Sequence, residues 1–423
     1  MMRHKLIFHI DVNSAFLSWE AAYRLCFLNS RIDLRDIPSA IGGDMAMRHG
    51  IILAKSIPAK KYGIKTGETL VEARQKCPNL LIAPPNYGLY EQCSRAFMDI
   101  LKEYSPAVEQ YSIDEAYVDM SGMESLLGEP EQVAEDMKNR IARELGFTVN
   151  IGISENKLLA KMASDFQKPH RVHTLYPEEI PEKMWKLPVS DLFFVGRATT
   201  RKLFLLGIKT IGQLAQADPA LLRFHLKKQG EVVWAFANGI DFSVVESRPI
   251  PNKGYGNSTT IHFDVTDAQT AKLVLLALAE TVGTRIRAEQ VKIEVISVGI
   301  KDYNLHYTSH QKVLGSATCI TKEIHREACI LFDELWDGTP IRHLGIHTSR
   351  VRDRDSMRQM NLLENIDYEK LETVDATMDR IRKRYGNDSI KRAVFAAPIG
   401  IDHMSGGISR EKRSVDYSKL NIE

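Results

Sequence analysis

The sequence has few cysteines, no long apolar run and almost no net charge. Its five cysteines, at positions 26, 77, 93, 319 and 329, form no Cys-x-x-Cys pair, which argues against a disulfide framework and against a structural zinc site. No apolar run approaches the roughly 18 residues that cross a bilayer, so we expect no membrane span. The 56 basic and 54 acidic side chains give a net charge of only +2, so a nucleic-acid partner requires local clusters of Lys and Arg.

The N-terminal stretch MMRHKLIFHIDVNSAF reaches Asp11 too early, and lacks a small-residue cleavage site, for a secretory signal. Together with the cysteine usage, this predicts a cytoplasmic protein. A chain of 423 residues predicts two to four domains, at about 150 residues per domain.

Strands and helices alternate in the first part of the chain. The apolar run at 6–12 is typical of a buried strand that ends on Asp11, and residues 147–154 predict a second one. Strand-like spacing also covers 108–120, while helical spacing covers 90–104, 132–145 and 155–166. This order predicts an α/β unit.

The rest of the chain changes character several times. Residues 31–84 are more irregular and contain a basic segment at 54–67, a candidate for phosphate binding. Residues 186–240 predict a small helical module, and 248–257, with two prolines and two glycines, predict a linker. Next comes a βαββαβ pattern of the split ferredoxin-like type, with its segments at 258–264, 267–288, 291–300, 304–313, 321–336 and 341–348. Residues 351–423 are polar and show a strong periodic segment only near 367–385, which predicts a tail rather than a further core.

Three carboxylates, Asp11, Asp114 and Glu115, stand in otherwise apolar strand contexts. A buried carboxylate is normally ion-paired or bound to a metal, and pairing or capping would explain any one of them. Three together, with few basic neighbours, suit hard divalent cations, above all Mg²⁺. Two such ions about 4 Å apart are a recurrent arrangement for nucleotidyl transfer, so a nucleotidyltransferase is the leading hypothesis.

Asp114 and Glu115 are neighbours, although successive strand residues point to opposite faces. We therefore predict that the chain reverses here. VEQYSI and AYVDM would be the arms of a hairpin, with both carboxylates near its bend and turned toward Asp11.

Four motifs, in order, carry a resemblance to a known family: HIDVNSAF, LAKSIPAKKYGIKTG, YSIDEAYVD and NIGISENKLLAKMASDFQKP. The chain resembles the Y-family translesion DNA polymerases over about residues 5–350. The resemblance implies an α/β multidomain, right-hand polymerase with a ferredoxin-like palm, small fingers, a helical thumb with a helix-hairpin-helix and a βαββαβ little finger. The implied domains are 1–14 and 85–178 (palm), 15–84 (fingers), 179–243 (thumb), 244–257 (linker), 258–350 (little finger) and 351–423 (tail).

The family pattern implies roles for individual residues of the core. It places two Mg²⁺ ions on Asp11, Asp114 and Glu115, with the backbone carbonyl of Val12 as a further ligand. It makes Phe16 a steric gate against the ribose 2′-hydroxyl, although without the motif a core aromatic would be the better interpretation.

Lys60 and Lys168 match positions that contact the triphosphate of the incoming nucleotide, although a single lysine is more often a solvated surface residue. The chain departs from many relatives at Ile57 and Lys60, where they carry Tyr and Arg.

Two further segments resemble DNA- and protein-binding parts of the family. LFFVGRATTRKLFLLGIKTIGQL resembles a helix-hairpin-helix that binds a DNA phosphate, with Gly196 kept and the second glycine replaced by Arg197; a plain helical connection is the alternative. QMNLL, from Gln359 to Leu363 and including Leu362, resembles the peptide that docks on the sliding clamp, or else is a leucine pair that opens a tail helix.

The resemblance thus implies a monomeric, low-fidelity DNA polymerase without proofreading that uses primer–template DNA and dNTPs. Two other functions stay open at the level of sequence. A nucleotide cyclase could use similar carboxylates but would not need the thumb, the βαββαβ domain or a clamp peptide. A catalytically inactive DNA-binding adaptor is disfavoured by the presence of all three carboxylates.

Overall fold

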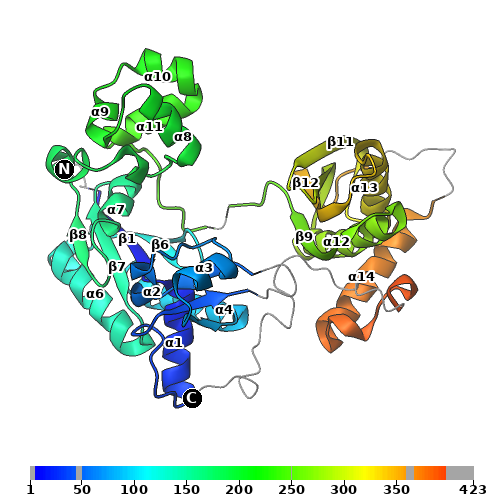
Figure 1. Cartoon of the computed structure of the whole chain (residues 1–423), viewed down its shortest axis with the longest axis horizontal. Helices are drawn as coiled ribbons and strands as arrows, with labels where there is room; N and C mark the ends of the chain where they lie inside the picture. The colour runs from blue at the N-terminus through cyan, green and yellow to red at the C-terminus, as the bar shows by residue number, and fades with distance from the viewer. Residues whose placement is uncertain (1–4, 44–49, 249, 359–365, 397–423) are drawn as a thin grey trace. The chain divides into compact units, whose positions relative to one another are not determined.

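The computed structural model describes residues 5–43, 50–248, 250–358 and 366–396, which divide into two compact units. The first unit holds the described residues up to 42 and from 52 to 250, and the second holds those from 251 onward together with the described residues of 43–51 (Figure 1). Within the described ranges, every helix is too short or too polar to cross a membrane.

The centre of the first unit is a five-stranded sheet with the order β5-β6-β1-β7-β8. β1 is the middle strand and runs antiparallel to both of its neighbours, while β7 and β8 are parallel. The strands are β1 (Ile7–Val12), β5 (Val108–Gln110), β6 (Glu115–Asp119), β7 (Val149–Ser154) and β8 (Val172–Thr174). The predicted strands at 6–12 and 147–154 are thus confirmed.

The two faces of this sheet are covered by different helices. Phe8 and Ile10 point into a core that also contains residues of the helices α1 (Ala15–Phe27), α4 (Tyr87–Tyr104) and α6 (Pro130–Leu145). The other face is covered by α7 (Lys157–Ser164), which contacts β1 and β7. α7 approaches β7 closely because Gly152 has no side chain: a Cβ there would lie 2.0 Å from the carbonyl oxygen of Ala160.

Residues 31–84 are less irregular than their sequence indicates. β2 (Ser39–Gly42), β3 (Ile52–Lys55) and β4 (Leu81–Ala83) form a second, three-stranded sheet with the order β3-β2-β4. Strands of three or four residues are too short to establish an alternating pattern, which explains why the sequence hides them. The helices α2 (Ile57–Lys61) and α3 (Leu70–Lys76) complete this part.

The predicted helical module packs around a buried core that it shares with α7. It consists of α8 (Arg197–Leu205), α9 (Ile211–Ala215), α10 (Pro219–Leu226) and α11 (Lys228–Ala237), after short helical turns between 177 and 191. The short helix α5 (Glu124–Leu127) precedes α6 in the chain.

The second unit has the predicted βαββαβ order. Its antiparallel sheet runs β11-β10-β12-β9, so β12 lies between β9 and β10 and splits the first βαβ unit. α12 and α13 pack on the sheet through one apolar core. The elements are β9 (Gly256–Val265), α12 (Ala268–Ala288), β10 (Val291–Asp302), β11 (Tyr307–Thr318), α13 (Thr321–Leu335) and β12 (Ile341–Asp353).

The segment after residue 351 differs from the polar tail that the sequence indicates. β12 continues to Asp353, and α14 (Tyr368–Tyr385) packs against α12. Phe395, only 9 % exposed, joins the core of the second unit. The expectation of a separate tail is wrong for residues 366–396, where α14 docks mainly through buried ion pairs that a search for apolar patterns does not find.

Candidate active site

The site is built where β1 ends beside the start of β6. Asp11 of β1 pairs directly with Glu115 of β6, so both side chains lie on the face of the sheet that α7 covers. Asp11 is only 8 % exposed and Glu115 is half-buried. Two carboxylates more than a hundred residues apart in sequence are thereby placed opposite each other.

Asp114 lies in the turn that joins β5 to β6. The amides of Tyr111 and Ser112 both donate to the carbonyl of Glu115, which closes the turn, and the Ser112 hydroxyl donates to Asp114 Oδ1 at 2.6 Å. The Asp114 carbonyl accepts a hydrogen bond of 3.0 Å from the amide of Val12, which ties the turn to the end of β1. The predicted hairpin is confirmed, with Asp114 in its turn and Glu115 as the first residue of β6.

Two lysines face these carboxylates. Lys161 of α7 donates a hydrogen bond to Glu115 Oε1, and its Nζ lies 3.8 Å from Asp11 Oδ2. Lys168 donates to the same Asp11 oxygen, and both lysines pair with Asp165, at 3.6 Å and 2.8 Å. The sequence predicts a role for Lys168 but not for Lys161. Lys161 lies among apolar residues of a buried helix, and a lysine in such a position is the signal that could have identified it.

Burial governs the electrostatics of the cluster. It raises the pKa of the Asp11 carboxyl, and the charges of Lys168 and Lys161 offset this only in part. For Lys161, burial lowers the pKa, but Asp11, Asp165 and Glu115 outweigh it, so the pKa lies above its ordinary value. The site is therefore a tightly coupled set of opposite charges in a poorly solvated place.

The carboxylates supply hard oxygen donors of the kind that divalent cations prefer. Within the described ranges, no three Asp, Glu, His or Cys side chains are grouped closely enough to hold an ion as they stand. Lys161 instead lies between Asp11 and Glu115. The donor chemistry fits a divalent cation, because a buried carboxylate with a raised pKa is stabilised by nearby positive charge.

The structure places Phe16 in the first turn of α1, four residues after Val12. Its ring stacks on Tyr90, with centroids 4.6 Å apart and planes 5° apart, and also contacts Trp19. Phe16 itself is only half-buried. It is held in one orientation by the aromatic core while part of it stays accessible.

Lys60 is not joined to the carboxylate cluster by any contact that the structure describes. It is exposed on α2, a helix capped by the side chain of Ser56. Burial, together with the nearby charge of Lys60, lowers the pKa of Lys55. The basic segment therefore places Lys55 of β3 and Lys60 of α2 close enough to influence each other.

Gly196 is the N-cap of α8, and Arg197 is the first helical residue; both are exposed. No side chain caps this helix start. A Cβ on Gly196 would meet no atom within 4 Å, so packing alone does not require glycine here. Gln359, Leu362 and Leu363 lie outside the described residues.

Comparisons with known proteins match three segments of the chain to family models and most of its length to individual relatives. Sequence models match at residues 10–165 (impB/mucB/samB family), 177–208 (IMS family HHH motif) and 252–362 (impB/mucB/samB family C-terminal domain).

DNA polymerase IV of Clostridium acetobutylicum is 45 % identical over 395 residues, which are 92 % of this chain and 98 % of that protein. DNA polymerase IV of Acetivibrio thermocellus is 36 % identical over 95 % of this chain and 100 % of its own length. Among solved structures, a chimeric Y-family DNA polymerase superimposes with a TM-score of 0.70 at 20 % identity, over 82 % of this chain and 99 % of its own.

Proposed function

Because the chain belongs to the impB/mucB/samB family, we propose that Asp11, Asp114 and Glu115 are the catalytic carboxylates of a template-directed polymerase. The protein is a DNA-directed DNA polymerase that performs translesion synthesis on primer–template DNA with dNTPs. The observation that carries the proposal is the direct β1–β6 pairing of Asp11 with Glu115, with Asp114 at the adjoining turn.

The polymerase depends on a divalent metal, and we infer that this metal is Mg²⁺, bound as two ions. Asp11, Asp114, Glu115 and the carbonyl of Val12 would hold them. When bound, divalent cations lower the pKa of the primer 3′-hydroxyl and neutralise charge on the triphosphate. The proposed synthesis is of low fidelity and without proofreading.

The chain's own residues prepare the site for an anionic substrate. Lys161 and Lys168 bring two positive charges next to Asp11 and Glu115, and these charges partly offset the rise that burial causes in the pKa of Asp11. Lys168, whose side chain is 36 % exposed, is the better placed of the two to reach a triphosphate. We assign Lys60 to the same triphosphate from the fingers.

Domain roles follow from these assignments. We propose that the five-stranded sheet is the palm, the three-stranded part the fingers, the helical module the thumb and the βαββαβ unit the little finger. Gly196 and Arg197 would contact a DNA phosphate with the uncapped amides of α8 and the guanidinium. We further infer a monomer that works in the cytoplasm.

Replacing Phe16 with alanine should weaken discrimination against ribonucleotides by at least about tenfold, because a ring held by Tyr90 would no longer fill the space of a 2′-hydroxyl. The measurement is the ratio of kcat/KM for dCTP and CTP opposite a template guanine. Phe27→Ala is the matched control, since Phe27 lies on the same helix and is 73 % exposed. An unchanged ratio in Phe16→Ala would refute the gate assignment.

Leu362→Ala combined with Leu363→Ala should abolish the stimulation of synthesis by the sliding clamp while leaving clamp-free synthesis intact. The reason is the loss of two apolar side chains that would fill a clamp pocket. Leu126→Ala with Leu127→Ala removes an exposed leucine pair elsewhere and is the control. If the clamp stimulates the Leu362→Ala, Leu363→Ala variant as strongly as the wild type, the assignment of residues 359–363 as the clamp-binding peptide is wrong.

Primer extension tests the function as a whole. Purified protein should extend a primer on undamaged and lesion-bearing templates, chelation of divalent metal should stop it, and Asp114→Ala should be inactive. Extension by Asp114→Ala at the wild-type rate would show that the carboxylates were misassigned.

A further inference from the structure

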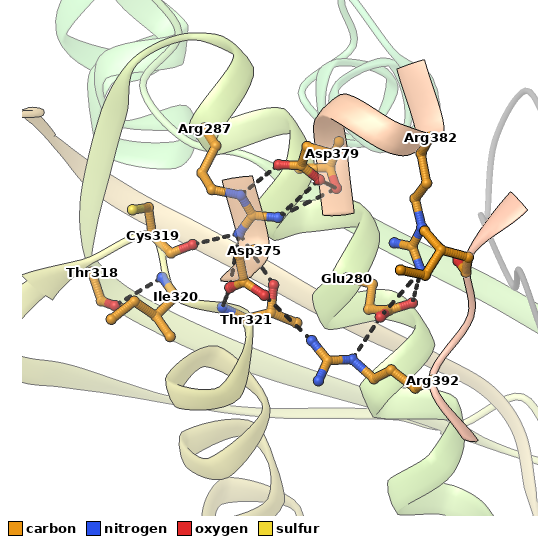
Figure 2. Close-up of polar contacts among 12 residues, drawn as sticks. Glu280, Arg287, Thr318, Cys319, Ile320, Thr321, Asp375, Asp379, Arg382 and Arg392 are labelled. Atoms are coloured by element: carbon orange, nitrogen blue, oxygen red, sulfur yellow. Dashed lines mark hydrogen bonds and ion pairs between the residues drawn. The ribbon is translucent and has the colours of Figure 1, made fainter. Parts of the chain in front are cut away.

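α14 is fixed on the second unit by a buried ion-pair cluster (Figure 2). Arg287 of α12 pairs with Asp379 at 2.6 Å and with Asp375 at 3.3 Å, and its side chain is only 12 % exposed. Asp375 also accepts a hydrogen bond of 2.8 Å from the amide of Thr321, the first residue of α13. α14 is thus an integral part of the second unit, and the exposed side chains of α14 form part of the surface of that unit.

A second set of contacts extends the junction. Glu280 of α12 pairs with Arg392 at 2.6 Å and with Arg382 at 3.3 Å, as Figure 2 shows. Glu372 of α14 lies 3.5 Å from the ammonium of Lys292. The carboxylates along this junction are therefore already paired with cations.

An open groove of about 1120 Å³ lies next to these ion pairs and is lined mainly by residues of α12 and α14. Seven cationic and three carboxylate side chains line it, and each of the three carboxylates is among those already paired. Within the part of the chain that the structure describes, five of the cations have no carboxylate partner: Arg285, Arg354, Arg380, Lys383 and Arg384. The groove carries an uncompensated positive charge.

An aromatic ring stands in the same groove. Tyr385, the last residue of α14, is 65 % exposed, and the Arg384 guanidinium lies 5.2 Å from its ring centroid. A cationic groove with an exposed aromatic side chain is the combination by which proteins hold single-stranded nucleic acid, since phosphates meet the cations and a base stacks on the ring.

We propose that the groove between α12 and α14 binds single-stranded DNA through its phosphates and through a base stacked on Tyr385. The exposed ring favours a nucleic acid over an acidic peptide, because a peptide carboxylate gains nothing from a stacking surface. This site goes beyond the proposed polymerase function, and neither Lys161 nor the three catalytic carboxylates belongs to it.

The test is the binding of fluorescein-labelled dT30 to the full-length protein, followed by anisotropy over a range of salt concentrations. Lys383→Ala with Arg384→Ala should weaken binding about tenfold, and the loss of two contacts should reduce the salt slope by about 1.4, at about 0.7 per phosphate. Tyr385→Ala should weaken binding about fivefold with the salt slope unchanged, because it removes stacking and no charge.

The matched control is Lys322→Ala with Lys370→Ala, which removes the same charge from exposed positions of α13 and α14 outside the groove. Single-nucleotide extension on a primer–template with a one-nucleotide overhang should be the same in all variants, which separates this proposal from the polymerase function. Equal losses in the groove and control variants would overturn the proposal. So would an unchanged affinity in Tyr385→Ala combined with equal competition by poly-glutamate, which would point to an acidic protein partner.

Discussion

Asp11→Asn should lower the rate constant of single-nucleotide addition on the order of 10³-fold, which is the loss expected when one preorganised charge-stabilising group is removed. Asp11 is the most buried of the three carboxylates and is held by Lys168 and Lys161. The amide keeps the size of the side chain and can still accept a hydrogen bond from Lys168. It cannot supply the negative charge that a divalent cation requires.

The same substitution should leave the fold and DNA affinity nearly unchanged. Burial disfavours the ionised form of Asp11, as its raised pKa indicates, so a neutral amide is tolerated at this position. Asp119→Asn is the control, because Asp119 lies on the same face of β6 as Glu115. Its side chain accepts a hydrogen bond from the amide of Ser121 and from no lysine that the structure describes. Rapid-quench measurement of both variants decides the matter, and a loss below tenfold in Asp11→Asn would contradict the assignment.

Asp375→Ala should destabilise the second unit by about 3 kcal/mol, because it removes one of the two carboxylates paired with a buried guanidinium and leaves a buried amide without its acceptor. Asp375 is 5 % exposed and serves two elements at once. It neutralises Arg287 and accepts from the amide of Thr321, at the start of a helix whose N-cap position is occupied by the apolar Ile320. Its loss leaves Arg287 with Asp379 as its remaining carboxylate partner and leaves the first amide of α13 without its acceptor.

Hydrogen exchange of the α12, α13 and α14 amides in the full-length protein measures this effect. Asp367→Ala is the graded control, because Asp367 caps α14 at an exposed position and its loss should cost about 1 kcal/mol. The loss of stability in Asp375→Asn should lie between those of Asp375→Ala and Asp367→Ala, because the side-chain amide oxygen can still accept a hydrogen bond from the backbone amide of Thr321. Equal exchange in Asp375→Ala and Asp367→Ala would mean that α14 is not an integral part of this unit.

The sequence predicts that Asp11, Asp114 and Glu115 meet at one edge of a sheet because two strong patterns coincide there. The apolar run at 6–12 reaches Asp11 near its end, and two adjacent carboxylates in a strand-like stretch indicate a nearby bend. The register that sets Asp11 against Glu115 depends on long-range pairing and is visible only in the fold. Lys161 was missed for the same reason, since its partners lie on two distant strands.

Other features leave weaker traces in the sequence. The three-stranded sheet rests on strands of three or four residues, below the length at which alternation can be recognised. The docking of α14 depends on Arg287, Asp375 and Asp379, which look like ordinary surface charges until they are buried together. Patterns of hydrophobicity cannot identify an interface of this kind.

The central claim is that Asp11, Asp114 and Glu115 together hold the metal ions of nucleotidyl transfer. The most direct measurement counts Mn²⁺ ions by electron paramagnetic resonance in the complex with a dideoxy-terminated primer–template and a non-hydrolysable dNTP. About two ions per protein are expected for the wild type, as in other two-metal sites, and fewer for Asp114→Ala. The same number of bound ions in Asp114→Ala as in the wild type would contradict the account.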